Sequence, residues 1–168
     1  METDEGTGIS EGFFSAADFE AIGRLAIACT DLDASLTELI AAILEIHMVD
    51  AIILVHEQGF ASKYQAIVNL MFEREKGDQL DEALRNAFAR SKEIYEHRNA
   101  IVHGVYGTDE NGLLIGRVRT RGGLKVSKKP FDREHVLKDA SEGFRLAFEF
   151  RMARRDYLEK LARGELAN

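Results

Sequence analysis

The sequence has few of the residues that mark exported, membrane-spanning or disordered proteins. Its 168 residues include one cysteine, one proline and no tryptophan. A lone Cys29 cannot form an internal disulfide, and a single proline is atypical of disordered or Pro-rich segments. The N-terminus begins with acidic residues, whereas a signal peptide begins with basic ones. The longest apolar run covers residues 39–44, far fewer than the ~18 residues of a membrane helix. We therefore expect a cytoplasmic protein that does not enter a membrane.

Basic residues are scarce in the first half of the chain. Residues 1–84 contain four Lys/Arg against seventeen Asp/Glu, a net charge of −13. Residues 85–168 contain eighteen Lys/Arg against twelve Asp/Glu, a net charge of +6. The overall charge of −7 counts against a nucleic-acid partner, but this asymmetry indicates self-association or a localised anion-binding surface.

Hydrophobic periodicity predicts an all-α fold, a bundle of four or five helices in a single domain over residues 1–168. Residues 1–13 form a flexible arm, and Ser15 caps a long first helix with Phe14 and Phe19 as a hydrophobic staple. Apolar residues three and four apart then run from Ile22 to Ile46, which is typical of a bundle core or a dimer seam. Four further helices are expected. The first two cover residues 51–57, capped by Asp50, and residues 60–77. The third runs from the cap Asp78 to the C′ glycine Gly104, and the last runs from the cap Asp132 to about Arg163, with an apolar side formed by Val136, Ala140, Phe144, Phe148, Phe150 and Tyr157.

Between the last two helices the period changes to that of strands. The segments 105–107, 113–121 and 124–129 are separated by Asn111-Gly112 and Gly122-Gly123, the residue pairs that tight hairpin turns require. We therefore predict a small antiparallel β-hairpin or meander, inserted over residues 105–130 before the last helix.

The end of the penultimate predicted helix carries the residues best suited to chemistry. Asn99 and His103 are four residues apart and share one helix face, with Glu96 close to that line. Arg98 falls on the apolar stripe, where a guanidinium needs a carboxylate partner or a ligand phosphate. His103 lies in the last turn, where the helix C-terminus favours its protonated form. Three polar groups able to handle a phosphodiester therefore meet at one helix end.

The pattern Arg98-Asn99-x-x-x-His103 resembles the R-polar-x-x-x-H motif of the HEPN superfamily (higher eukaryotes and prokaryotes nucleotide-binding), in its sequence and in its place within a small helical bundle. The resemblance implies a homodimer and a metal-independent endoribonuclease of the toxin or phage-defence type, whose motif lines a cleft between two protomers. RNA would be its substrate, and an antitoxin or defence-system protein a further partner.

The chemistry of RNA cleavage suits these residue types. Arg98 would neutralise the phosphate in the transition state, His103 would transfer a proton, and Asn99 would position the phosphate or the imidazole. One histidine per chain cannot readily serve as both acid and base, which favours a site shared by two protomers. The route needs no metal and no cofactor.

A structural interpretation of the same residues stays open. Arg98 would then pair with Asp31, Asp33 or Glu38 of the first helix, and His103 would bind the last helical carbonyls. The protein would in that case be a non-catalytic helical binding or assembly module. An enzyme needs Arg98 and His103 open to a cleft, whereas a module would have Arg98 locked to a carboxylate.

The predicted hairpin is strongly basic. Over residues 113–131 it has no acidic residue, and Arg117, Arg119 and Arg121 share one face of a strand by the period of two. Three interpretations stay open: a ribbon that follows RNA phosphates, a sheet edge protected by charge, or a surface that docks on the acidic half of a second chain. The candidate RNA-binding residues are Arg117, Arg119, Arg121, Lys125, Lys128 and Lys129.

The histidine spacing does not predict a metal site. His-x3-His and His-x-x-Glu-His patterns are both missing, although such spacings are typical of zinc sites on helices. We therefore expect no metal ligands among His47, His56, His97, His103 and His135.

Overall fold

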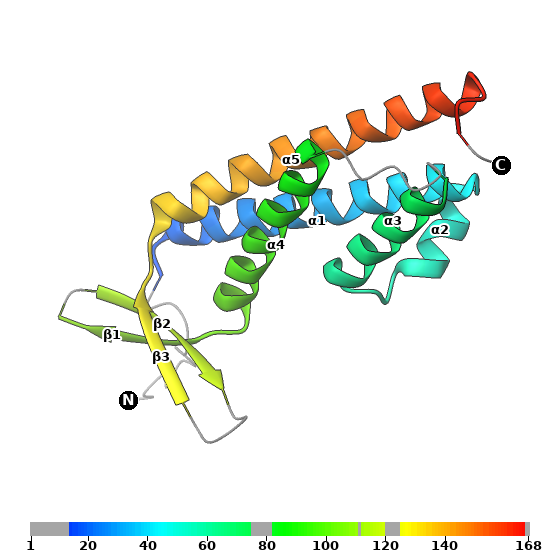
Figure 1. Ribbon diagram of the computed structural model, residues 1–168. Coiled ribbons are helices and arrows are strands. Elements are labelled where there is room, and N and C mark those ends of the chain that lie inside the picture. The colour runs from blue at the N-terminus through cyan, green and yellow to red at the C-terminus, as the bar shows by residue number, and fades with distance from the viewer. Residues whose placement is uncertain (1–13, 75–81, 111, 120–124, 167–168) are drawn as a thin grey trace, which may run out of the picture.

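The computed structural model describes residues 14–74, 82–110, 112–119 and 125–166. Within these ranges it confirms a helical bundle with a small sheet before the last helix. Figure 1 shows the two longest helices side by side and the sheet projecting from one end. None of the described helices is long and apolar enough to cross a membrane. In chain order the elements are α1 Ala16–Leu44, α2 Met48–Val55, α3 Phe60–Arg74, α4 Glu82–Val102, β1 Val105–Asp109, β2 Gly112–Arg119, β3 Lys125–Pro130 and α5 Arg133–Ala162.

The predicted start of α1 is confirmed in detail. The Ser15 hydroxyl accepts a hydrogen bond from the Asp18 amide at 3.2 Å, and the Asp18 carboxylate accepts one from the Ser15 amide at 2.9 Å. This reciprocal pair is a capping box. The Phe14 and Phe19 rings lie with centroids 5.3 Å apart, as the staple requires. The two local signals therefore define where the first helix begins.

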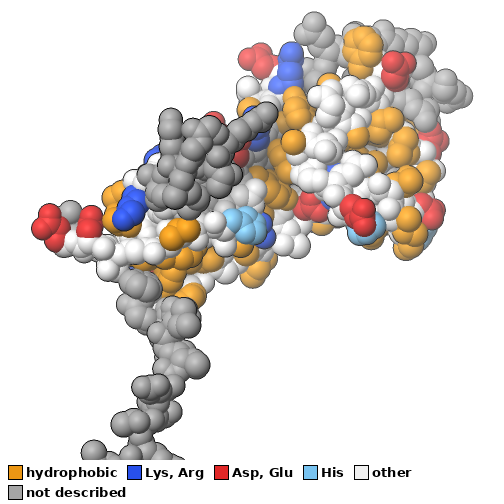
Figure 2. Space-filling view, turned by 90° about the horizontal axis from the view of Figure 1, so that it is seen from below, with side chains coloured by type: hydrophobic (Ala, Val, Ile, Leu, Met, Phe, Trp, Pro, Cys, Tyr) orange, Lys and Arg blue, Asp and Glu red, His pale blue; other side chains and the backbone are white. Residues whose placement is uncertain are grey.

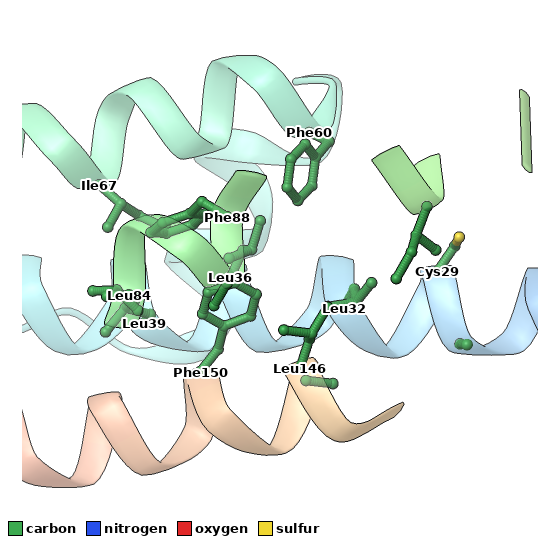
Figure 3. Close-up of a cluster of buried hydrophobic side chains, with 14 of the residues drawn as sticks. Cys29, Leu32, Leu36, Leu39, Phe60, Ile67, Leu84, Phe88, Leu146 and Phe150 are labelled. Atoms are coloured by element: carbon green, nitrogen blue, oxygen red, sulfur yellow. The ribbon is translucent and has the colours of Figure 1, made fainter. Parts of the chain in front are cut away.

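The core lies between α1 and its neighbours, and α1 makes its largest interface with α5. The two helices run in the same direction, because Asp18 near the start of α1 contacts Arg133 at the start of α5, and Asp31 contacts Arg151 further along. Gly143 allows a close approach, since a Cβ there would lie 3.0 Å from the Ala28 Cβ. Figure 3 shows α1 side chains meeting those of the other helices, including Cys29, Leu32, Leu36, Leu39, Phe60, Ile67, Leu84, Phe88, Leu146 and Phe150.

The stripe of α1 is therefore a core seam rather than a dimer seam. Leu25, Leu32, Leu36, Leu39 and Ile43 are each no more than 1% exposed. Burying a leucine or isoleucine contributes about 1.5–3 kcal/mol each to stability, so this single helix supplies a large part of the folding free energy.

Two helix predictions were wrong in part. The short helix α2 begins at Met48 and is capped by His47, whose Nδ1 accepts a hydrogen bond from the Val49 amide, instead of beginning after Asp50. On α5, Phe144 and Phe148 are 41% and 62% exposed and do not join the core. Gly143 and Ala147 are buried instead, and Phe144 and Phe148, each the next residue along, lie about 100° further round the helix. The predicted cap Asp78 lies outside the described residues.

The three strands form an antiparallel sheet in the order β1-β2-β3, as predicted. Its first hairpin closes where Asp109 pairs with Gly112, whose φ of 120° is strained for any residue with a side chain. Phe14 contacts the rings of Tyr106 and Phe131 at 4.9 and 5.6 Å, which attaches the sheet to the start of α1.

Gly104 joins α4 to β1 in a way that differs from the prediction. Its φ lies outside the left-handed region, so it is not the C′ glycine of a helix cap. A Cβ at this position would collide with the Ala100 carbonyl oxygen and lie 2.7 Å from Ile115 Cγ2. Glycine is required here because the backbone passes directly against β2.

Candidate functional site

The predicted catalytic residues lie together at the C-terminal end of α4. Arg98 Nη1 donates a hydrogen bond to Asn99 Oδ1 at 2.9 Å, so the structure brings these two side chains into contact. His103 follows the last residue of the helix, and its amide donates to the Asn99 carbonyl at 3.0 Å. Arg98 is half-buried, whereas Asn99 and His103 are exposed. The motif is therefore open to solvent on the side of Asn99 and His103.

The carboxylates expected to neutralise Arg98 are occupied by other cations. Arg151 of α5 binds Asp31 at 2.6 Å and Glu38 at 3.5 Å, and Lys63 of α3 binds Asp33 at 2.6 Å. The structural interpretation of Arg98 as a partner of α1 carboxylates is therefore wrong for all three. Among the described residues its Nε atom is buried without a hydrogen-bond partner, and no carboxylate binds its guanidinium.

Arg98 lies near a buried hydrogen bond between α4 and α1. The Tyr95 hydroxyl donates a hydrogen bond to the Cys29 carbonyl oxygen at 2.6 Å. Burial raises the pKa of the Cys29 thiol to about 11 and also raises the pKa of Tyr95, while the positive charge of Arg98 opposes both shifts. The guanidinium of Arg98 therefore lies close enough to this contact to act on both groups.

A second group of chemically capable residues lies where α4 contacts α5. His97 Nδ1 lies 2.6 Å from Asp139 Oδ2, and His135 Nε2 lies 3.6 Å from the same oxygen. The two imidazole rings have centroids 4.8 Å apart. Asp139 is only 1% exposed, and its carboxylate contacts both histidines and Arg90. We call His97, His135 and Asp139 the His-Asp cluster.

Arg90 completes the network between α4 and α5. Its guanidinium donates to Asp139 at 2.7 Å, to Glu93 at 2.7 Å and to Glu142 at 3.0 Å. The hydrogen bonds that Arg90 donates to Glu142 and Glu93 raise the pKa of Arg90, and the one to Glu142 holds the pKa of Glu142 below its usual range. One guanidinium is therefore shared by three carboxylates.

A pocket of about 480 Å³ adjoins the His-Asp cluster and the sheet. It includes both histidines of the cluster and one residue of the predicted RNA-binding set, Lys129. Its lining consists of Glu96, His97, Ala100, Ile115, Ser127, Lys129, Pro130, Asp132 and His135.

The predicted RNA-binding residues are distributed over β2 and β3. Arg117 pairs with Ser127 and Arg119 pairs with Lys125 across the two strands. Lys128 and Lys129 are exposed, while Arg121 lies outside the described residues. Their contact with RNA stays a prediction.

The histidine spacing in the sequence did not reveal the His-Asp cluster. His97 and Asp139 are 42 residues apart, and they meet only because α4 and α5 pack antiparallel. The one local signal is His135-x3-Asp139, which places both side chains on one face of α5. The His-x3-His and His-x-x-Glu-His patterns both require two histidines on one helix, whereas this cluster takes one histidine from each of two helices.

Comparisons with known protein families, with curated proteins and with solved structures find no match to this chain. The functional argument therefore rests on Arg98, Asn99 and His103 at the end of α4 and on the His-Asp cluster between α4 and α5.

Proposed function

We propose that this chain is a metal-independent endoribonuclease of the HEPN type, acting as a homodimer. The observation that carries the proposal is the state of Arg98: its guanidinium is held by the Asn99 amide oxygen and not by a carboxylate of the described chain. A charged fork of this kind, beside an exposed histidine, is suited to binding a phosphate.

The proposed reaction is an internal transfer at phosphorus. The RNA 2′-hydroxyl loses its proton to one His103 imidazole, and its oxygen attacks the adjacent phosphorus. The bond from phosphorus to the 5′-oxygen breaks, and a protonated imidazole gives its proton to that leaving oxygen. Arg98 neutralises the equatorial phosphate oxygens, and Asn99 holds the guanidinium in place. The products are a 2′,3′-cyclic phosphate and a 5′-hydroxyl.

A second copy of the chain would supply the second imidazole. Support comes from apolar side chains that flank His103: Val102 is 43% exposed and Val105 is 56% exposed. Figure 2 shows that hydrophobic side chains are exposed over much of one face of the molecule. Apolar residues around a polar centre are typical of an interface that excludes water from its core.

The test is cleavage of a pool of single-stranded RNA oligonucleotides by the untagged protein. Cleavage should yield cyclic-phosphate ends and should persist with a chelator. Arg98→Ala and His103→Ala should each abolish it while the helical circular dichroism stays unchanged. Replacing the RNA by DNA of the same sequence should also abolish it, because the nucleophile is the 2′-hydroxyl.

Matched controls are available in the same chain. Arg24→Ala and His56→Ala remove an exposed arginine and an exposed histidine whose ion-pair partners are Glu20 and Glu57, and both variants should cleave at the wild-type rate. The proposal is overturned if the folded wild-type protein leaves RNA intact, or if the two motif variants still cut it. The protein would then be the binding or assembly module.

A further inference from the structure

We propose that His97, His135 and Asp139 bind a divalent transition-metal ion, with Zn²⁺ the best-fitting species, and that the ion joins α4 to α5. The site uses His97, the residue of α4 next to Arg98, together with two residues of α5. It uses none of the residues assigned to RNA cleavage, so it stands or falls independently of the proposed function.

The separations of the three donor groups suit one shared ion. Donors about 2.1 Å from a tetrahedral ion lie about 3.4 Å from one another. His135 Nε2 is already 3.6 Å from Asp139 Oδ2, and all three ligand atoms lie within 4.8 Å of one another. To bind one ion, His97 Nδ1 must move out from its 2.6 Å hydrogen bond with Asp139, and the two imidazole nitrogens must come from within 4.8 Å of each other to about 3.4 Å. Both histidine side chains are partly exposed and can rotate by this amount.

The surroundings supply the remaining features of a metal site. The Asp139 carboxylate is buried, and Arg90 binds its second oxygen, Oδ1, at 2.7 Å. A hydrogen bond of this kind orients a metal-binding carboxylate while leaving the other oxygen, Oδ2, for the ion. Arg90 also faces Glu93 and Glu142, so it does not neutralise the cluster by itself. The nearby Glu96 adds a further negative charge at the pocket wall.

The local backbone holds two of the ligands in register. The Asp132 carboxylate caps α5 by accepting a hydrogen bond from the His135 amide at 3.0 Å. This fixes His135 in the first turn of α5 and Asp139 one turn later, on the same face. His97 comes from the antiparallel α4, so a bound ion would bridge two helices that are separated in sequence by the sheet.

The donor set selects the class of metal. Two imidazole nitrogens and one carboxylate oxygen suit Zn²⁺ and its neighbours Co²⁺ and Ni²⁺, whereas Mg²⁺ and Ca²⁺ require oxygen ligands. Three protein ligands leave a fourth tetrahedral position. Since both histidines line the 480 Å³ pocket, water or an anion can reach that position, with Lys129 on the pocket wall.

The experiment is titration of the untagged full chain, after treatment with a chelator and dialysis, with Zn²⁺ and separately with Mg²⁺. Isothermal titration calorimetry should show one Zn²⁺ per chain and no Mg²⁺ binding. At a hundredfold excess of Zn²⁺ over its dissociation constant, the melting temperature should rise by about 5–10 °C. Co²⁺ bound in place of Zn²⁺ should give the visible absorption of a tetrahedral centre.

Variants locate the ion. His135→Ala should weaken Zn²⁺ binding by more than about 100-fold, since a lost ligand costs at least as much as a lost second-shell partner. It removes the more exposed histidine and should leave the fold intact; Asp139→Asn keeps the shape of the side chain and should give the same loss. His56→Ala is the matched control and should bind Zn²⁺ normally. The proposal is overturned if wild-type protein binds no Zn²⁺, or if His135→Ala and His56→Ala bind it equally.

Discussion

The ionisable side chain of Lys63 lies in the interior of the bundle. It is 2% exposed, and its ammonium group donates hydrogen bonds to Asp33 at 2.6 Å and to Thr37 at 3.2 Å. The Asp33 side chain, by contrast, is 41% exposed. Water can therefore reach the Asp33 carboxylate but not the Lys63 ammonium group, which relies on Asp33 and Thr37 for its contacts.

This inequality predicts unequal costs for removing each partner. Asp33→Asn leaves a buried ammonium without its counter-charge and should lower the free energy of unfolding by about 3 kcal/mol. Lys63→Met leaves a carboxylate that water can reach and should cost only about 1 kcal/mol. Urea unfolding of both single variants and the double variant measures these values. Equal costs for the two single variants would contradict the argument.

Cys29 predicts a loss of stability in alkali. Its pKa is about 11 in the folded protein, because of burial, against an ordinary value of 9.0. Below pH 9 the thiol is protonated in both states, whereas between pH 9 and 11 it ionises only when the chain unfolds. The free energy of unfolding should therefore fall with rising pH in this window, by up to about 1.4 kcal/mol per pH unit.

The burial of Tyr95 raises its pKa and acts in the same direction at higher pH. Urea unfolding in reductant at pH 8, 9 and 10 isolates the cysteine contribution. Cys29→Ala should show a smaller decrease between pH 9 and 10 than the wild type. A native thiol that reacts with Ellman's reagent at pH 8 as fast as the unfolded chain would disprove its burial.

At the scale of elements, the junction between α4 and β1 depends on the absence of a side chain. Gly104→Ala would place a methyl group against the Ala100 carbonyl oxygen and Ile115. Such overpacking typically costs about 1–3 kcal/mol. Gly107→Ala is the matched control in the same sheet, because a Cβ there meets nothing within 4 Å. Chemical denaturation should show the loss for Gly104→Ala alone.

The basic β2–β3 ribbon offers a test of RNA binding. Changing Arg117, Arg119 and Arg121 together to Gln removes three charges, so the slope of log affinity against log salt should flatten by about 2. Binding should weaken nearly uniformly across RNA sequences, because phosphate contacts do not read bases. Fluorescence anisotropy with labelled single-stranded RNA at several salt concentrations measures both effects.

Two other outcomes would assign the ribbon differently. Unchanged affinity with new aggregation would show that the arginines protect a sheet edge. Loss of self-association would show that the ribbon docks on a second chain. The control variant changes Arg24, Arg155 and Arg163 to Gln, which removes the same charge from the two long helices.

The elements were predictable from sequence where the signal was local. Ser15 and Asp132 cap α1 and α5 through contacts with residues three positions away. Gly112 predicts a turn because glycine adopts the positive φ that this position has. Contacts between distant elements were not predictable in this way. The sequence does not indicate which cation binds Asp31. The packing of α5 against α1 brings Arg151, and not Arg98, to this carboxylate.

The whole molecule is predicted to self-associate. With the α1 stripe used in the core, three grounds remain: the opposite net charges of the two halves of the chain, the exposed Val102 and Val105 beside His103, and the exposed side chains of α2, of which Ile53 and Leu54 are 66% and 58% exposed. Light scattering at micromolar concentration should give about twice the chain mass of 18.8 kDa. A single peak at the mass of one chain would contradict a catalytic site shared by two protomers.

The contact between His97 and His135 has a consequence for how the chain can be altered. The helices α4 and α5 precede and follow the sheet in the chain and contact each other through His97 and His135, so they form a helical hairpin in which the three strands take the place of a short loop. Short loops commonly join antiparallel helices in bundles. Residues 105–130 are therefore a natural position for grafting: a few glycine and serine residues, or a foreign domain with adjacent termini, should fit between the two helices without changing how they pack.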